Sequence, residues 1–410
     1  MPLVHPDAAV KLAGPSWLVD RRAEALASIE ESGLPSSKEE VWRYSPIDDL
    51  DPDRYQAQGG PVEASIPTSL SQGAAVVMVG RDGTVEIPGD LSGVTVSTLG
   101  IHAEAQDLLG AAAGFHDPIV ALSTAQLADG VVVDVPRGSM VASTILLVHP
   151  IGAGTTAGRT IVRLADGAAA TVIELFIGGD GEVLNLPVAE LLVGDGANLR
   201  YGSLQMLGRS AWHLATIDAV VGRDATVSQL TAGLGGAYDR CRTDVVLDGQ
   251  GASSVLRSTY LGDGSQIHDL RTKQDHVAPK TISDLLCKGA VADTSRSVYS
   301  GLIKMRHGAI RSNAMQTNHN LVLSESAHAD SVPNLDISEN DVRCSHASTV
   351  GPIDEDQRYY LESRGIPRPA AENLLIRGFF ADLLERPEAA PAGAVIAAEV
   401  DVRLAALDLS

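Results

Sequence analysis

The middle of the chain consists of short apolar runs that are interrupted at regular intervals. From about Val131 to Val350, runs of Val, Ile, Leu and Thr are broken every dozen or so residues by Gly and Asp. Runs of this length and composition, bounded by turn-forming residues, predict many short strands.

A recurring phrase organises these strands into a repeat. The phrases LADGA, VGDGA, VGRDA and DGQGA end 29, 28 and 27 residues apart, at Ala168, Ala197, Ala225 and Ala252. A period in the twenties indicates a solenoid, because one coil can bury its apolar face only against its neighbours. Two weaker echoes, RHGA at Ala309 and SESA at Ala327, are less regularly spaced. A β-sandwich is the alternative that this imperfect repeat leaves open.

Helical patterns precede the strands. Apolar residues recur with helical spacing from about residue 16, and Gly33 and Pro35 should end this first helix. A second helix is expected to begin near Ser36 and to run toward residue 50.

The segment between these helices and the strands is mixed. Residues 51–73 are rich in Gly, Pro, Ser and Gln and predict a linker. The segment AAVVMVGRDGTVEI, residues 74–87, alternates around a glycine-containing turn and predicts a hairpin. A further helix is expected over 102–114.

Helical patterns return after about Asp354. One segment stops at Gly365, and the next begins at Pro369, which suits the first turn of a helix. A last amphipathic stretch covers 395–407. The middle helix has one wide apolar face, which either packs on the solenoid or docks a partner: Leu374, Leu375, Phe379, Leu383, Leu384. The expected division is a helical region with a hairpin at 1–130, a β-helix core at 131–350 and a helical domain at 351–410.

Composition and charge exclude several classes of protein. Of the 410 residues, 44% are hydrophobic and 20% charged, so a sizeable core is expected. The formal net charge of −21 would repel nucleic acid and an anionic membrane surface. There is no apolar run of about 18 residues, and no basic segment followed by an apolar one opens the chain, so a cytoplasmic location is expected.

The motifs of common enzymes are absent. The sequence contains no GxxxxGK[ST] loop, no HExxH and no GxSxG. The glycine-rich GLGGA at 233–237 has the wrong spacing for a dinucleotide site and predicts a turn. Asp293 and Arg296 are expected on a solvated face or a turn; because polysaccharide lyases are also β-helix proteins, a catalytic pair is the alternative.

The cysteines limit the metal sites that one chain could build. Cys241, Cys287 and Cys344 are far apart and form no CxxC pair, so neither a disulfide framework nor a four-thiolate site is expected. Cys344 and His346 are two residues apart, and in a strand their side chains would point to the same side. Thiolate and imidazole both bind iron, and together they make half a site. A buried free cysteine beside a surface histidine is the commoner explanation of such a pair.

Other histidines crowd the same half of the chain and slightly favour a ligand-rich surface, although most are expected in turns or on the surface. They are His268, His276, His307, His319 and His328.

Long segments resemble a known family. The segment PNLDISENDVRCSHASTVGPIDEDQRYYLESRGI, followed by AAENLLIRGFFADLL, resembles the C-terminal signature of the SufB/SufD family of iron-sulfur cluster assembly subunits. The segment from KTISDLLCKGA to ESAHADSVP resembles the family's core, and GLPSSKEEVWRYSPIDDL resembles its N-terminal helical segment. DVRCSH is similar to the SufD branch, and NHNLVLS places His319 where the SufB branch is expected to carry a cysteine. Ala347 stands where many relatives are expected to have glycine.

The resemblance implies a fold and a function. The fold would be mainly β, with a right-handed parallel β-helix core flanked by N-terminal and C-terminal helical regions. The chain would be a non-catalytic subunit that pairs with SufB through the solenoid ends and docks the ATPase SufC through its C-terminal helices. His346, and less certainly Cys344, would contribute to a transient iron-sulfur cluster at the SufB interface.

Three alternatives stay open at this stage. The chain could be a purely structural docking subunit, a SufB-like homodimeric scaffold, or a flavin-binding reductant subunit. Cluster type, flavin binding and homodimer formation by the isolated chain cannot be derived from the sequence.

Overall fold

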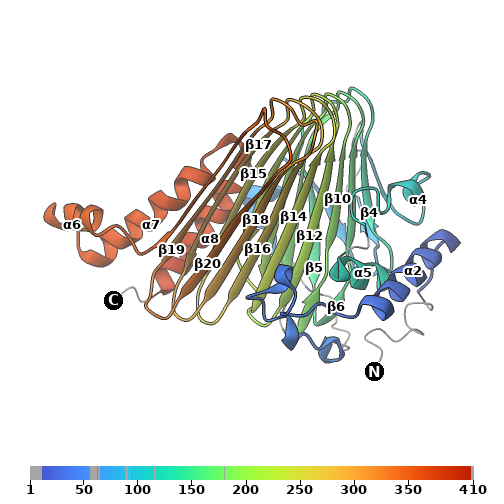
Figure 1. Ribbon diagram of the computed structural model, residues 1–410. Helices are drawn as coiled ribbons and strands as arrows, with labels where there is room; N and C mark the ends of the chain where they lie inside the picture. Colours follow the sequence, from blue (N-terminus) through green and yellow to red (C-terminus); the bar gives the residue numbers. More distant parts are fainter. Residues whose placement is uncertain are drawn as a thin grey trace.

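The strand-rich centre of the chain folds into a parallel β-solenoid with helices at both ends (Figure 1). The computed structural model describes residues 12–55, 62, 65–87, 91, 93–114, 117–179 and 181–407. Each coil contributes one strand to each of two facing sheets, so strands close in the sequence lie in different sheets. The solenoid predicted from the repeat is confirmed, and the β-sandwich alternative is wrong.

The strands of the two sheets run in chain order along the solenoid. Sheet A follows the order β2 (Val85–Glu86), β1 (Ala75–Val79), β5 (Ile145–Ile151), β8 (Ala169–Gly178), β11 (Asn198–Leu207), β13 (Thr226–Gly233), β15 (Ser253–Gly262), β17 (Ile282–Val291), β19 (Asn313–Val322), β21 (Arg343–Gly351). Sheet B follows the order β20 (His328–Ile337), β18 (Arg296–Met305), β16 (Ile267–His276), β14 (Tyr238–Leu247), β12 (Trp212–Val221), β10 (Val188–Val193), β7 (Arg159–Leu164), β4 (Val131–Val135), β3 (Thr95–Thr98). The short strands β6 (Gly154–Thr156) and β9 (Val183–Asn185) pair with each other, and β9 also pairs with β12.

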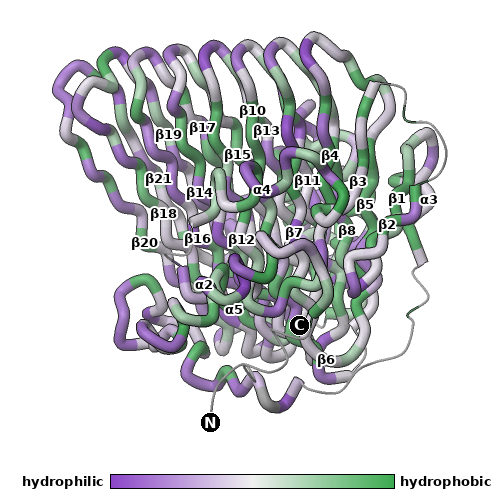
Figure 2. The backbone as a smooth tube through the Cα atoms, turned by 90° about the vertical axis from the view of Figure 1, so that its right-hand side faces the viewer, coloured by the Kyte–Doolittle hydropathy of each residue, from purple (hydrophilic) through white to green (hydrophobic). Residues whose placement is uncertain are grey.

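The repeated DGA-type phrases are the turns that lead from sheet B to sheet A, here called the forward turns. Their final alanines stack in the interior and are at most 1% exposed: Ala168, Ala197, Ala225, Ala252. Ala309 lies in the forward turn between β18 and β19, whereas Ala327 lies in a turn that leads back from sheet A to sheet B, here called a return turn. Figure 2 shows the turns aligned along one edge of the solenoid. The repeat therefore marks one of the two rows of turns.

Helices from both termini cover the outer faces of the sheets. Seven N-terminal helical elements precede or interrupt the first strands. They are α2 (Ser16–Ser32), η1 (Glu40–Trp42), η2 (Ile47–Asp49), η3 (Pro52–Tyr55), α3 (Thr68–Ser71), α4 (Ala105–Leu108) and α5 (Pro118–Ala125). Trp42, Ile119 and Leu122 pack with Leu214 and Tyr238 on the outer face of sheet B. These contacts anchor the N-terminal region to the solenoid.

The C-terminal helices follow the predicted pattern. They are α6 (Glu355–Ser363), α7 (Arg368–Leu384), the turn η4 (Pro387–Ala389) and α8 (Gly393–Ala406). Pro369 lies in the first turn of α7, and Gly365 after α6 has a φ of 86°. Phe380 and Leu383 of α7 pack with Leu286 on the outer face of sheet A. Most of the predicted apolar face therefore packs on the solenoid.

Two N-terminal predictions were wrong. No α-helix begins at Ser36; the segment forms the 3-10 turns η1 and η2, because Tyr44 adopts a left-handed φ of 71° and Pro46 follows. Of the helix expected over 102–114, only α4 is helical. The hairpin at 74–87 is confirmed, since β1 and β2 pair antiparallel.

Part of the predicted linker, residues 56–61, 63 and 64, lies outside the described residues. Its remaining part includes η3 and α3. Across the described part of the chain, no helix combines the length and the apolar character required to cross a membrane.

Candidate functional site at the open end of the solenoid

The last coil, formed by β20 and β21, leaves the end of the solenoid uncovered. Within the described residues, β21 pairs only with β19 and β20 only with β18, so each strand has a free edge. The apolar residues Leu335, Ile337 and Val350 of this coil are 38–45% exposed. A repeat protein normally needs a terminal cap, and a free strand edge favours pairing with another chain.

Cys344 and His346 lie on the inner side of this last coil. Cys344 packs beside Met305 and Ala314, which line the solenoid interior. Ser348 donates a hydrogen bond of 2.7 Å to Ser331 across the coil, so it also faces inward. His346 lies between Cys344 and Ser348 with strand alternation, and its side chain therefore leaves the same face.

The two side chains differ in their surroundings. Cys344 is half-buried, and burial raises the pKa of its thiol above the usual value. The thiol is therefore protonated at neutral pH until a metal ion or a base displaces the proton. His346 is exposed at the mouth of the coil. It is therefore the more accessible side chain of the pair.

A row of polar side chains inside the solenoid leads to this coil. Along sheet A, registered strand pairs place one inward residue per coil in a line that ends at the open end: Glu174, Ser203, Thr231, Ser258, Cys287, Asn318, Ser348. Thr231 and Ser258 share a hydrogen bond of 2.7 Å, and Asn318 donates one of 2.8 Å to Ser331. The sequence analysis missed this row, although the alternation of Gln316, Asn318 and Asn320 was a signal for it.

The other two cysteines are sealed in the interior. Cys241 and Cys287 are at most 9% exposed. Burial raises the pKa of Cys241 to about 12 and also raises the pKa of Cys287. Both thiols therefore stay protonated and are poor candidates for metal ligands.

The remaining histidines do not form one ligand-rich surface. His268 and His276 are completely buried, and both ring nitrogens of His276 have hydroxyl partners, Thr281 at 2.7 Å and Ser283 at 2.9 Å. His307 and His328 are on the outside, and His328 lies 3.1 Å from Asp330. No group of three or more His, Cys, Asp or Glu in the described residues could hold a metal ion. Cys344 and His346 therefore have no third residue of these types beside them among the described residues.

Two other sequence signals are parts of turns. Leu234 to Ala237 of GLGGA connect β13 to β14, which confirms the predicted turn. Asp293 has a left-handed φ of 52° in a return turn, and its carboxylate accepts a hydrogen bond of 2.8 Å from the Gly264 amide.

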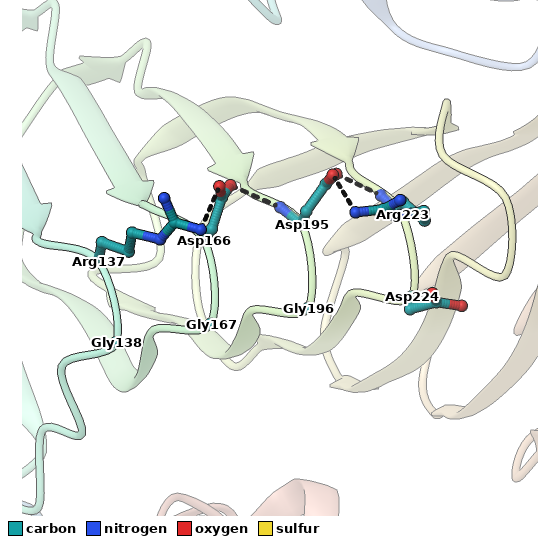
Figure 3. A pocket seen from close by; sticks show the side chains of 8 residues that line it. All are labelled: Arg137, Gly138, Asp166, Gly167, Asp195, Gly196, Arg223 and Asp224. Carbon is teal, nitrogen blue, oxygen red and sulfur yellow. Dashed lines mark hydrogen bonds and ion pairs between the residues drawn. The ribbon is translucent and has the colours of Figure 1, made fainter.

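A hollow of about 460 Å³ lies along the forward turns (Figure 3). Its side chains bond mainly to the next turn: the Asp166 carboxylate accepts from the Asp195 amide at 3.1 Å, and the Asp195 carboxylate accepts from the Arg223 amide at 2.8 Å. Gly167 and Gly196 both have a φ of 66°. This ladder stabilises the stacked turns and occupies the carboxylates of Asp166 and Asp195.

A second exposed surface is carried by the C-terminal helices. α6 has no buried residue, and Tyr359 and Tyr360 are 71% and 57% exposed. Leu374, in the first half of α7, is 50% exposed. Figure 1 shows α6 projecting from the side of the solenoid. Exposed aromatic residues on a projecting helix are suited to contact a partner.

Comparison with known proteins identifies the family. The model of the SUF system FeS cluster assembly SufBD core domain matches residues 149–379, which is more than half of the chain. The chain is 31% identical over 375 residues to the iron-sulfur cluster assembly protein SufD of Escherichia coli, covering 88% of this chain and 87% of that protein. It is 28% identical over 381 residues to a SufBD family protein of Mycobacterium tuberculosis (90% and 89% covered) and 26% identical over 402 residues to SufD of Bacillus subtilis (90% of each). The solenoid with its open coil therefore belongs to a member of the SufBD family.

Proposed function

We propose that this chain is the SufD-like subunit of a SUF iron-sulfur cluster assembly complex and that its open coil completes a cluster site with SufB. His346 is the ligand that this chain supplies, and Cys344 is a secondary one. The observation that carries the proposal is the position of an exposed imidazole and a half-buried thiol on the inner side of an uncapped coil. The chain itself is non-catalytic, and the cluster is its cargo.

The free edges of β20 and β21 favour pairing with SufB. Backbone N–H and C=O groups along both strands can pair with the strands of a second solenoid, and the exposed apolar residues of the coil can be covered by it. A cluster ligated from two chains can be assembled when they close and released when they move apart, because each chain alone holds too few ligands.

The geometry ranks the two ligands. A neutral imidazole can bind iron without first losing a proton, provided that one ring nitrogen is free. The Cys344 thiol must be deprotonated, and its burial opposes this because the pKa is raised. His346 therefore binds first, and Cys344 joins only if metal binding displaces its proton.

The C-terminal helices are the proposed docking site for the ATPase SufC. No nucleotide-binding loop is present in the sequence, so ATP hydrolysis must come from a partner. The exposed Tyr359, Tyr360 and Leu374 form the contact surface. In this proposal the division into 1–130, 131–350 and 351–410 separates the N-terminal region, the β-helix core and the SufC-docking domain.

The proposed place of action is the cytoplasm. All three cysteines are free, as expected of a protein that works where thiols are kept reduced.

Co-expression with SufB and SufC tests the ligand role. His346→Ala is compared with wild type and with His328→Ala, a control on the outer face of the same coil whose side chain is 58% exposed. We expect all three complexes to form equally and the His346→Ala complex alone to lose most of its bound iron and sulfide under anaerobic conditions. If that complex carries the wild-type amount, His346 is no ligand and the chain is a purely structural subunit.

A further inference from the structure

Two exposed residues of α7 are unfavourable for the helix itself. Gly378 lies in the middle of α7 and, among the described residues, is the only glycine within a helix beyond the first helical residue. Glycine destabilises a helix relative to alanine, because its backbone loses more freedom on folding. Glu385 directly follows the last residue of α7, where the partial negative charge of the helix end opposes a carboxylate.

The packing of this chain gives neither residue a reason. Gly378 has no left-handed φ, and a Cβ atom there would meet nothing within 4 Å. At Gly393, by contrast, a Cβ atom would lie 2.3 Å from the Leu384 carbonyl oxygen, so internal packing requires that glycine. The Glu385 carboxylate is exposed and has no hydrogen bond or ion pair within the part of the chain that the structure describes. Local rules broken without an internal gain are typical of functional surfaces.

Both residues share one face of α7 with Leu374. Residues four and eleven positions apart lie on nearly the same side of a helix, as 374, 378 and 385 do. The Leu374 side chain is 50% exposed. This face, here called the α7 face, therefore presents an apolar side chain, a stretch of bare backbone and a free carboxylate in order along the helix.

The other charged side chains nearby are already paired within the chain. Arg377 is 2.8 Å from Asp401 of α8. Asp382 is 2.6 Å from Lys288 of β17. Glu385 is therefore the charge that the α7 face offers to a partner.

We propose that a helix of the ATPase SufC packs across the α7 face, with its backbone against Gly378, an apolar side chain over Leu374 and a basic side chain on Glu385. This inference deepens the proposed docking of SufC and rests on it. A missing side chain lets two helices approach closely, because the distance between their axes depends on the residues at the contact. Residues 351–410 include eleven acidic and six basic ones, so charge complementarity favours a basic partner surface.

Gly378→Ala tests the contact, because its two expected effects have opposite signs. In the isolated protein, alanine should strengthen α7 and slow hydrogen exchange of its amides about four- to fivefold. In calorimetric titration with purified SufC, the same variant should bind about tenfold more weakly, and Gly378→Leu more weakly still, because an added side chain overpacks the contact. An ordinary exposed helix position would gain the same stability and keep its affinity.

Two further variants make the test specific to the α7 face. Ala398→Leu enlarges an exposed residue of α8 and should bind SufC like the wild type. Glu385→Gln removes the free carboxylate and should weaken binding most at low salt, while the repulsion with the helix end is relieved.

The outcomes separate this inference from the proposed function. If the wild type binds SufC and Gly378→Ala binds equally well, or if Ala398→Leu loses as much affinity as Gly378→Ala, the contact at Gly378 is refuted and the docking of SufC stands. If the wild type does not bind SufC, the proposed docking fails and the contact fails with it.

Discussion

A buried ion pair between Arg159 and Glu190 should be essential for joining the N-terminal region to the solenoid. Their charged groups lie 3.1 Å apart on the outer face of sheet B, and neither side chain is more than 1% exposed. The Glu190 carboxylate also accepts hydrogen bonds of 2.9–3.1 Å from the amides of Gly110, Ala112 and Ala113. One carboxylate therefore holds a buried arginine and a loop at the same time.

The effect of removing it can be worked out from this geometry. At 3.1 Å and an effective dielectric constant of about 20, the attraction is about 5 kcal/mol. Glu190→Ala leaves the Arg159 charge buried and unpaired, which is expected to lower the free energy of unfolding by about 3–5 kcal/mol. Since whole domains are stable by about 5–15 kcal/mol, this is a large fraction.

Denaturation in guanidinium chloride and hydrogen exchange of the 110–113 amides measure the effect. Arg159→Met combined with Glu190→Gln should recover most of the stability, because it removes both charges and keeps an acceptor for the loop amides. Glu182→Ala breaks an exposed pair with Arg54 and should change little, since both side chains are 55% exposed. A loss below about 1 kcal/mol in Glu190→Ala, or no recovery in the double variant, would refute this reasoning.

Three further predictions concern pH, a turn and the docking surface. Burial lowers the pKa of His276 to about 4, below its value of 6.5 in the unfolded chain. The contribution of this neutral histidine to the unfolding free energy is therefore present above pH 6.5 and lost as the pH falls toward 4. In urea unfolding between about pH 8 and 5, the unfolding free energy should depend less on pH in His276→Gln than in the wild type. Gly196→Ala should lower the unfolding free energy by about 1–2 kcal/mol, because the φ of Gly196 is 66° and a side chain there would gain no contact to offset the strain. Gly158 is also in open space but has no left-handed φ, so the control Gly158→Ala should not reduce the unfolding free energy. Replacing Tyr359 and Tyr360 by serine should leave the unfolding free energy nearly unchanged and weaken binding to SufC in a pull-down; equal binding by the variant would exclude this face as the docking surface.

The sequence predicts those elements whose signals are local. The DGA-type turns and their stacked alanines predict the solenoid, because each turn needs a residue at a left-handed φ, which is glycine in three of them and Asp224 in the fourth, and a small residue in the interior. Helix α5 was missed because every residue from Ile119 to Ala125 is buried, so no polar face marks a helical period.

For the site, strand alternation was enough to predict that Cys344 and His346 share a face. The residue that lies beneath His346 in the ladder, Gln316, could not be predicted, because it depends on the register between β19 and β21. His346 pairs with Gln316, 30 positions earlier, and Gln316 pairs with Leu285, 31 positions earlier. Coil lengths therefore vary, and no fixed period in the sequence gives the pairing. The same dependence on register explains why the interior polar row was missed.

The two ends of the solenoid are unlike, and this limits how copies can associate. At the N-terminal end, the sheets finish in the short antiparallel strands β2 and β3, of two and four residues, which offer little edge for pairing. Growth of a filament requires that the head of one molecule fit the tail of the next, and here the tail is blunted. If the open end pairs with the open end of a second molecule, both free edges are covered, and association of this kind would stop at two molecules.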